Sequence, residues 1–160
     1  MKVKNQLLEN IYFKTAYEYA KLSTCLRRKV GSILVLDGRI ISSGTNGAPS
    51  HLQHCEKIGC FLDHEHCIRS IHSELNSLLF CVKRGIPTNG ASLFCTDFPC
   101  HNCLKALMMA GITDIKFHRD YTDSYNKLLA YDSRKYIKFY KYNEKSEKYL
   151  QYLIKQMDAK

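Results

Sequence analysis

The stretch ASLFCTDFPCHNCLKALMMAG at positions 91–111 predicts a β-strand that leads directly into an α-helix. Its first six residues are apolar or strand-favouring, and the run HNCLKALMMAG then has apolar residues at helical spacing. Pro99 suits the first turn of that helix because a residue there needs no N–H, and Gly111 is typical of the position after a helix. The stretch HSELNSLLF at 72–80 opens a second predicted helix over 73–84.

The rest of the chain completes an alternation of strands and helices. Ile33, Val35 and Ile40 flank the Asp37-Gly38 pair, so a β-hairpin is predicted over 30–44. Such alternation indicates a layered α/β domain with its sheet between helices. The 160 residues suffice for one domain, 1–160, with a real core. The other expected elements are helices over 6–22 and 124–131, strands over 114–118 and 134–142, and a terminal helix.

Composition and charge limit the classes of partner and compartment. The formal net charge of +9 favours phosphate-bearing partners, although the basic, Tyr-rich stretch 134–160 is also typical of a solvated helix face. No apolar run is long enough to cross a bilayer, and Glu9 interrupts the N-terminal segment where a signal peptide would be apolar. We therefore expect a soluble, cytoplasmic protein with no membrane partner. Eight cysteines in a reducing compartment indicate metal binding or catalysis rather than disulfides.

Two helix starts carry the residues of one predicted metal site. Cys100 and Cys103 stand three apart at a helix N-terminus, which favours negatively charged thiolates. A catalytic zinc ion usually has three protein ligands, so His72 at the mouth of the other helix is the candidate third ligand. Glu74, two residues on, is predicted to be a carboxylate that moves protons without binding the metal. The combined pattern H-x-E…P-C-x-x-C matches the signature of zinc-dependent nucleobase deaminases.

Longer stretches of the chain resemble the deoxycytidylate (dCMP) deaminase family. The similarity lies in STCLRRKVGSILVLDGRIISSGTNGAPS, HCEKIGC, HCIRSIHSELN and GASLFCTDFPCHNCLKALMMAGI, and covers roughly positions 23–121. The resemblance implies a cytidine-deaminase-like three-layer α/β/α fold with a central five-stranded mixed sheet. It also implies hydrolytic conversion of dCMP to dUMP, which supplies thymidylate synthesis, and a homo-oligomer, commonly a hexamer. His72, Cys100 and Cys103 would hold the zinc, and Glu74 would be the proton shuttle.

The same resemblance suggests substrate contacts. Asn46 would contact the nucleoside, Tyr121 would close over the substrate, and Arg27 would bind the phosphate with its fork of donors. The alternative, of equal weight, is that Arg27 is an exposed arginine in a basic stretch and binds no phosphate. Ser73 stands where the family usually has alanine, and its backbone would face the base. Thr45 replaces the usual Tyr of the G-Y-N-G loop, which puts regulation by dCTP or dTTP in doubt. Mg²⁺ is expected only as a companion of a bound nucleoside triphosphate.

The segment 46–69 lacks apolar periodicity and needs something to hold it in place. Four thiolates make a closed structural zinc site. We therefore expect a second, structural zinc on Cys25, Cys55, Cys60 and Cys67. His66 is the main alternative ligand, and the further alternatives are His51, His54 and His64.

Three alternative functions remain open at this stage. The first is a bifunctional enzyme acting on dCMP and dCTP. The second is a deaminase of single-stranded or flipped bases in polynucleotides, for which the chain offers little aromatic groove. The third is a non-catalytic zinc-stabilised nucleic-acid-binding module, which would need its C-x-x-C pairs to recur. We expect a small deoxycytidine nucleotide rather than nucleic acid as the partner.

Overall fold

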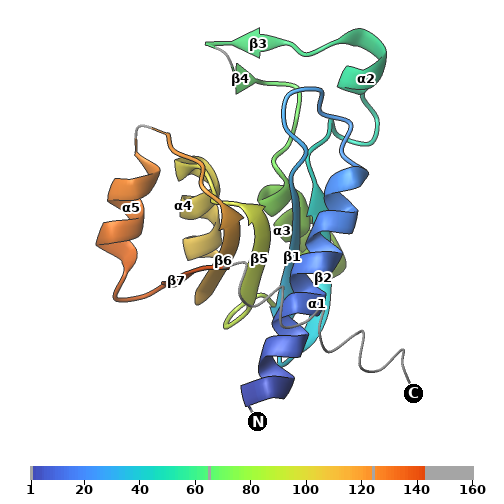
Figure 1. The fold of residues 1–160 in the computed structure, drawn as a ribbon. Helices are drawn as coiled ribbons and strands as arrows, with labels where there is room; N and C mark the ends of the chain where they lie inside the picture. The colour runs from blue at the N-terminus through green and yellow to red at the C-terminus, as the bar shows by residue number, and fades with distance from the viewer. Residues whose placement is uncertain (1, 65, 124, 143–160) are drawn as a thin grey trace, which may run out of the picture.

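A computed structural model describes residues 2–64, 66–123 and 125–142, and at its centre lies a five-stranded sheet in the order β2-β1-β5-β6-β7 (Figure 1). β1 pairs antiparallel with β2 and β5, whereas β5, β6 and β7 run parallel to one another. The predicted five-stranded mixed sheet is therefore confirmed. The strands are β1 (Gly31–Leu36), β2 (Arg39–Thr45), β5 (Ser92–Asp97), β6 (Asp114–Arg119) and β7 (Lys138–Lys141).

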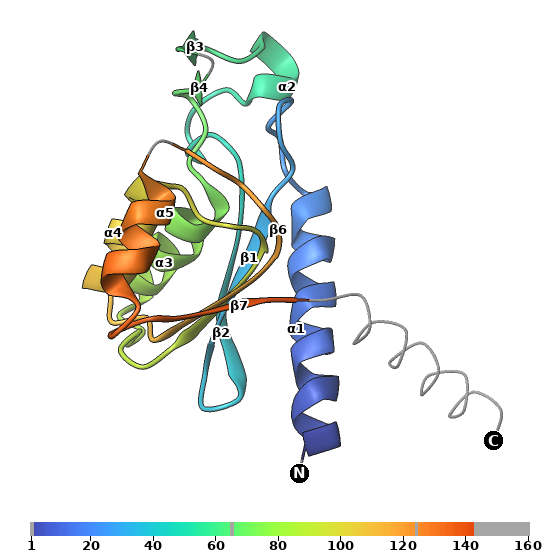
Figure 2. The same cartoon turned by 60° about the vertical axis from the view of Figure 1, so that its left-hand side comes forward.

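Helices cover both faces of the sheet, as the three-layer prediction requires. Figure 2 shows α1 (Lys2–Lys21) on one side and α3 (Ser73–Arg84), α4 (His101–Met109) and α5 (Asn126–Ser133) on the other. Within the described part of the chain, no helix combines the length and apolar character needed to cross a bilayer.

The alternation of side chains along the strands explains why two layers of helices are needed. Ile33 and Val35 of β1 pack with Tyr12 and Phe13 of α1, while Leu34 between them belongs to the core under α3 and α4. Because successive strand residues point to opposite faces, a strand with consecutive apolar residues such as Ile33, Leu34 and Val35 must be covered on both sides.

Several element boundaries differ from the sequence predictions. α4 begins at His101 with Cys100 as its N-cap, so Pro99 precedes the helix instead of occupying its first turn. α5 begins at Asn126 rather than 124, because the Asp123 carboxylate accepts a hydrogen bond of 2.7 Å from the backbone N–H of Asn126. α1 begins earlier than predicted, at Lys2, and β7 is shorter than its predicted strand. The predicted terminal helix lies outside the described residues.

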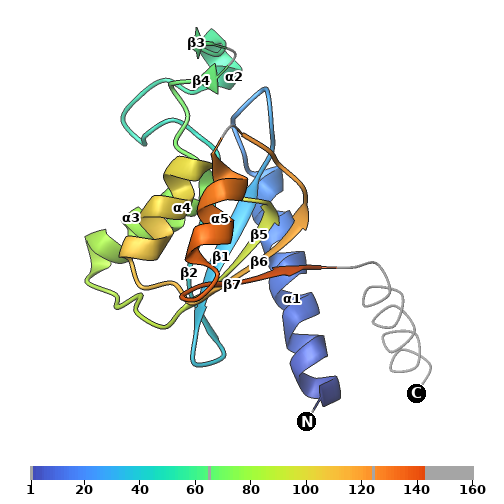
Figure 3. The ribbon, with the colours of Figure 1, turned by 90° about the vertical axis from the view of Figure 1, so that its left-hand side faces the viewer.

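The irregular segment between β2 and α3 extends beyond one end of the sheet (Figures 1 and 3). It contains α2 (Cys55–Ile58) and the short hairpin of β3 (Leu62–Asp63) and β4 (His66–Cys67). Two backbone hydrogen bonds between Gly47 and Ile71 close its base. The segment therefore emerges at the same place as the start of α3, which is where the predicted metal ligand His72 stands.

β2 contacts α3 through backbone atoms, and Gly44 permits this contact. A Cβ at Gly44 would lie 2.1 Å from the carbonyl oxygen of Ser73 and 2.6 Å from the amide nitrogen of Ser77. Such distances allow no side chain, so the start of α3 is held against the sheet only because residue 44 is glycine.

We expect Gly44→Ala to destabilise the protein by about 1–3 kcal/mol, because the added methyl group must push α3 away from β2. Urea unfolding followed by circular dichroism measures this change. Ser43→Ala is the matched control, since Ser43 points to the opposite side of β2 and is half-buried. Equal unfolding midpoints for the two variants would contradict the proposed close contact.

Candidate active site

The two helix starts singled out in the sequence meet at the carboxyl end of the parallel strands. His72 is the N-cap of α3, Cys100 is the N-cap of α4, and Cys103 lies in the first turn of α4. Their ligand atoms, one imidazole nitrogen and two sulfurs, all lie within 4.8 Å of one another. The carboxyl ends of strands in α/β sheets are where ligands usually bind.

The spacing of these three atoms fits a zinc ion. The Nδ1 atom of His72 lies 3.4 Å from Cys100 Sγ and 3.6 Å from Cys103 Sγ. Tetrahedral coordination with ordinary Zn–N and Zn–S bond lengths places the nitrogen and each sulfur about 3.6 Å apart. One nitrogen and two sulfur ligands are also a donor set that zinc favours, and they leave a fourth position for another ligand.

The three groups compete for protons. The hydrogen bond from Cys103 is the main cause that lowers the pKa of Cys100 to about 4, and the contact with His72 acts in the same direction. The same hydrogen bond, together with complete burial, raises the pKa of Cys103. The contact with Cys100 raises the pKa of His72. A cation placed between these groups would replace the shared protons.

Glu74 lies beside this group and is almost completely buried, with only 4% of its surface exposed. Burial raises its pKa, so the carboxyl group retains a proton at a higher pH than an exposed glutamate does. The hydroxyl of Ser73 donates a hydrogen bond of 2.9 Å to Glu74 Oε2. Among the described residues, Glu74 is not part of the metal group, so its position suits a proton-transferring group.

A cavity of about 220 Å³ opens over His72, Glu74 and Cys100. Both charged and aromatic side chains form its wall, which suits a ligand that carries a ring and an anionic group. The lining residues are Cys25, Arg27, Arg28, Val30, Asn46, His66, Cys67, Ser70, His72, Glu74, Asp97, Phe98, Cys100 and Tyr121.

Three of the four predicted substrate residues line this cavity: Arg27, Asn46 and Tyr121. The Asn46 side chain is held in place, because its Nδ2 donates to the Arg28 carbonyl at 3.1 Å and its Oδ1 accepts from the Ser73 N–H at 2.8 Å. Tyr121 is held through its carbonyl, which accepts a 2.8 Å hydrogen bond from Asn126 Nδ2.

Ser73 is placed differently from the sequence expectation. Its side chain is completely buried and does not line the cavity. The prediction was that its backbone would face the base, and the structure shows its N–H donating to Asn46 Oδ1. Ser73 therefore hydrogen-bonds to Glu74 and Asn46, which both line the cavity, and so helps to orient their side chains.

Sequence reasoning missed the acidic residue on the cavity wall. Asp97 ends β5, three residues before Cys100, and its carboxylate pairs with Arg28 and with Arg119. The signal was present in the sequence as an aspartate at the end of an otherwise uncharged buried strand. Its partners were not predictable, because they come from distant parts of the chain.

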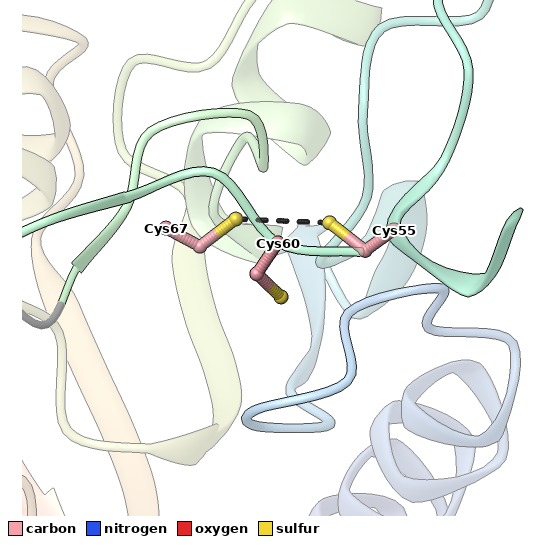
Figure 4. Close-up of side chains that lie close together, drawn as sticks. All are labelled: Cys55, Cys60 and Cys67. Atoms are coloured by element: carbon pink, nitrogen blue, oxygen red, sulfur yellow. Dashed lines mark hydrogen bonds between the residues drawn. The ribbon is translucent and has the colours of Figure 1, made fainter. Parts of the chain in front are cut away.

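A second group of cysteines lies in the segment beyond the sheet (Figure 4). The sulfurs of Cys55, Cys60 and Cys67 lie within 4.8 Å of one another, and Cys55 and Cys67 are 3.6 Å apart. Tetrahedral zinc thiolates have sulfurs about 3.8 Å apart, so this triad also fits zinc.

Cys25 and His66 do not join the triad in the described part of the chain, so the predicted four-cysteine set is brought together only as three. Cys25 lines the main cavity, as do His66 and Cys67. The two residues before Cys25 are held by a distant partner, because Ser23 Oγ and the Thr24 N–H both donate to the Asn46 carbonyl.

Comparison with known proteins agrees with this site. Residues 8–119 match the family described as the cytidine and deoxycytidylate deaminase zinc-binding region. ComE operon protein 2 of Bacillus subtilis is 41% identical over 113 residues, which are 70% of this chain and 60% of that protein. Deoxycytidylate deaminase of Saccharomyces cerevisiae is 30% identical over 71% of this chain and 38% of its own length. The chain thus spans less than two thirds of both relatives.

A solved structure of similar size also matches. The dCMP deaminase of cyanophage S-TIM5, solved in complex with dCMP and dUMP, is 29% identical with a TM-score of 0.73. The match covers 83% of this chain and 95% of that chain. The fold around the site is therefore that of a zinc-dependent deaminase domain.

We expect Cys103→Ala to lower the zinc content of the purified protein by about one ion per chain, because two remaining ligands hold zinc weakly. Inductively coupled plasma mass spectrometry measures the content. Cys81→Ala is the control, since Cys81 is a buried cysteine outside both metal groups among the described residues. An unchanged zinc content in Cys103→Ala would rule out this cysteine as a ligand.

Proposed function

The chain belongs to the cytidine and deoxycytidylate deaminase family, and on that premise we propose that it hydrolyses dCMP to dUMP and ammonia. The observation that carries this proposal is the meeting of three zinc-type ligands with a buried carboxyl group in one cavity. A mononucleotide substrate is favoured by the cyanophage relative, whose structure contains dCMP and dUMP. The arginines on the cavity wall favour a substrate with a phosphate group.

The proposed ligands of the catalytic zinc are His72, Cys100 and Cys103. A zinc ion in this position supplies Lewis-acid activation of a water molecule. Glu74 would take a proton from the water molecule and deliver it to the N3 atom of the pyrimidine ring as the water oxygen bonds to C4. A second proton from the same oxygen would pass through Glu74 to the amino group, so that the bond between C4 and the amino nitrogen breaks, ammonia leaves and the C4 carbonyl of dUMP forms. The raised pKa of the buried carboxyl group supports this role, because a proton carrier works best when its pKa is close to the working pH.

The remaining cavity residues position the nucleotide in this proposal. Asn46 presents an amide whose orientation is set by Ser73 and Arg28, and it contacts the nucleoside. Tyr121 covers the substrate from the loop after β6. Arg27 binds the phosphate, which its exposed guanidinium group can reach from solvent. Ser73 acts indirectly, through its hydrogen bonds to Glu74 and Asn46.

The wider organisation of the protein is part of the same proposal. Residues 1–160 form a single deaminase domain in a cytoplasmic homo-oligomer, a hexamer by resemblance to the family. A structural zinc binds Cys55, Cys60 and Cys67, with Cys25 or His66 as the fourth ligand after a local rearrangement. In this proposal Mg²⁺ binds only as the counter-ion of a nucleoside triphosphate.

We expect Glu74→Gln to keep the zinc and to lower kcat for dCMP by about 10²–10⁴-fold, because the amide cannot carry a proton. Release of ammonia and formation of dUMP measure the rate. Glu18→Gln, an exposed change on α1, should leave kcat unchanged. Near wild-type turnover in Glu74→Gln would remove the proton-transfer role.

A substrate panel tests the proposed activity itself. Wild-type protein is incubated with dCMP, dCTP, deoxycytidine and a cytosine-containing oligonucleotide, and ammonia is followed. The proposal expects dCMP to have the highest kcat/KM. Ammonia from the oligonucleotide alone would identify a polynucleotide deaminase, and no ammonia from any of the four would identify a non-catalytic zinc protein.

For the second metal, we expect Cys60→Ala to lose about one zinc ion per chain while Cys103 and its partners keep theirs. The zinc content should fall from about two ions per chain to about one, again with Cys81→Ala as the control. A wild-type content of one ion per chain, unchanged in Cys60→Ala, would show that the triad holds no zinc.

A further inference from the structure

The carboxylate of Asp97 lies between two guanidinium groups on the wall of the cavity. Its Oδ2 pairs with Arg28 Nε, and its Oδ1 lies 2.8 Å from Nε and 2.6 Å from Nη2 of Arg119. Only 5% of the Asp97 side chain is exposed. A buried carboxylate with two charged partners is a fixed arrangement, because the cost of burying its charge is offset only while guanidinium groups pair with it.

Arg28 is held by more than this ion pair. Its Nη2 donates to the Asp120 carbonyl at 3.4 Å, and its Cζ lies 5.1 Å from the centre of the Tyr121 ring. The guanidinium group is thus held between a carboxylate and the aromatic ring proposed to cover the substrate. In this position Asp97, which Arg28 shares with Arg119, offsets part of its charge, and its Nε donor is already used.

Arg27, the neighbouring residue, differs from Arg28 in its exposure and in its contacts. It is exposed and lines the same cavity. Among the residues that the structure describes, it makes no hydrogen bond or ion pair. Two consecutive arginines therefore reach the cavity, one committed to Asp97 and Tyr121 and one available to a ligand.

We propose that Asp97 is a specificity-determining residue that favours nucleoside monophosphates over triphosphates. It pairs with Arg28 and holds it against Tyr121. Arg27 is then the guanidinium group that remains available to bind a phosphate. This inference rests on the proposed function. One guanidinium group matches one phosphate group through two parallel hydrogen bonds. A triphosphate carries more negative charge and gains more from each additional uncompensated cation than a monophosphate does.

Asp97 also has a structural role, which the test must separate from specificity. Through Arg119, which is its partner across the parallel pair of β5 and β6, it connects two strand ends. Arg119 does not line the cavity, and its Nη2 also donates to the Lys29 carbonyl at 3.1 Å. Arg119→Gln therefore weakens the structural connection without releasing Arg28, and it serves as the matched control.

The experiment compares kcat/KM for dCMP and dCTP in zinc-loaded wild type, Asp97→Asn, Arg119→Gln and the double variant Asp97→Asn/Arg28→Gln. We expect Asp97→Asn to raise the dCTP-to-dCMP ratio roughly fivefold at low salt, the effect of one uncompensated charge near the surface. The increase should shrink at high ionic strength, because salt screens the charge. Arg119→Gln should keep the wild-type ratio, and the double variant should return close to it because the released guanidinium is gone.

Three results would overturn the inference: an unchanged ratio in Asp97→Asn with normal zinc content, the same increase in Arg119→Gln, or an increase that persists in the double variant.

If Asp97→Asn does not fold, the single variants Arg27→Gln and Arg28→Gln decide, since both arginines are at least partly exposed. The inference expects KM for dCMP to rise about tenfold in Arg27→Gln and much less in Arg28→Gln. Equal increases would contradict it. A wild type inactive on every cytosine substrate would instead refute the proposed function.

Discussion

The arrangement on which the rest depends is the approach of one imidazole nitrogen and two sulfurs to within zinc-binding distance of one another. No single element brings them together. α3 carries His72 and is held against β2 because Gly44 has no side chain. α4 carries the two cysteines and follows directly from the end of β5. The sheet therefore sets the metal geometry by fixing where two helices begin.

The same two helix starts determine the electrostatics of the cavity. Among the described residues Glu74 forms no ion pair with a lysine or arginine, and burial raises its pKa although the neighbouring His72 acts in the opposite direction. Asp97, at the end of β5, is equally buried but lies between two guanidinium groups. Two carboxyl groups of similar exposure thus have different surroundings, one suited to carrying a proton and the other to orienting a cation.

The fold and the grouping of His72 with Cys100 and Cys103 were predictable from the sequence because their signals are local. A run of consecutive apolar strand residues, the Asp37-Gly38 turn and metal-binding residue types at helix starts can each be recognised from a few neighbouring residues. Three features were not predictable for the opposite reason. Ser73 donates its N–H to Asn46, 27 positions away, and Asp97 pairs with Arg28, 69 positions away. Cys25 is held at the main cavity by hydrogen bonds of its neighbours to the Asn46 carbonyl, which no spacing rule anticipates.

The most direct measurement is anomalous X-ray diffraction at the zinc absorption edge from crystals of the wild-type protein. The account predicts an anomalous peak within bonding distance of His72 Nδ1, Cys100 Sγ and Cys103 Sγ, next to the Glu74 carboxyl group but not bonded to it. Crystals in which zinc is present, but only away from these three atoms, would contradict the central claim.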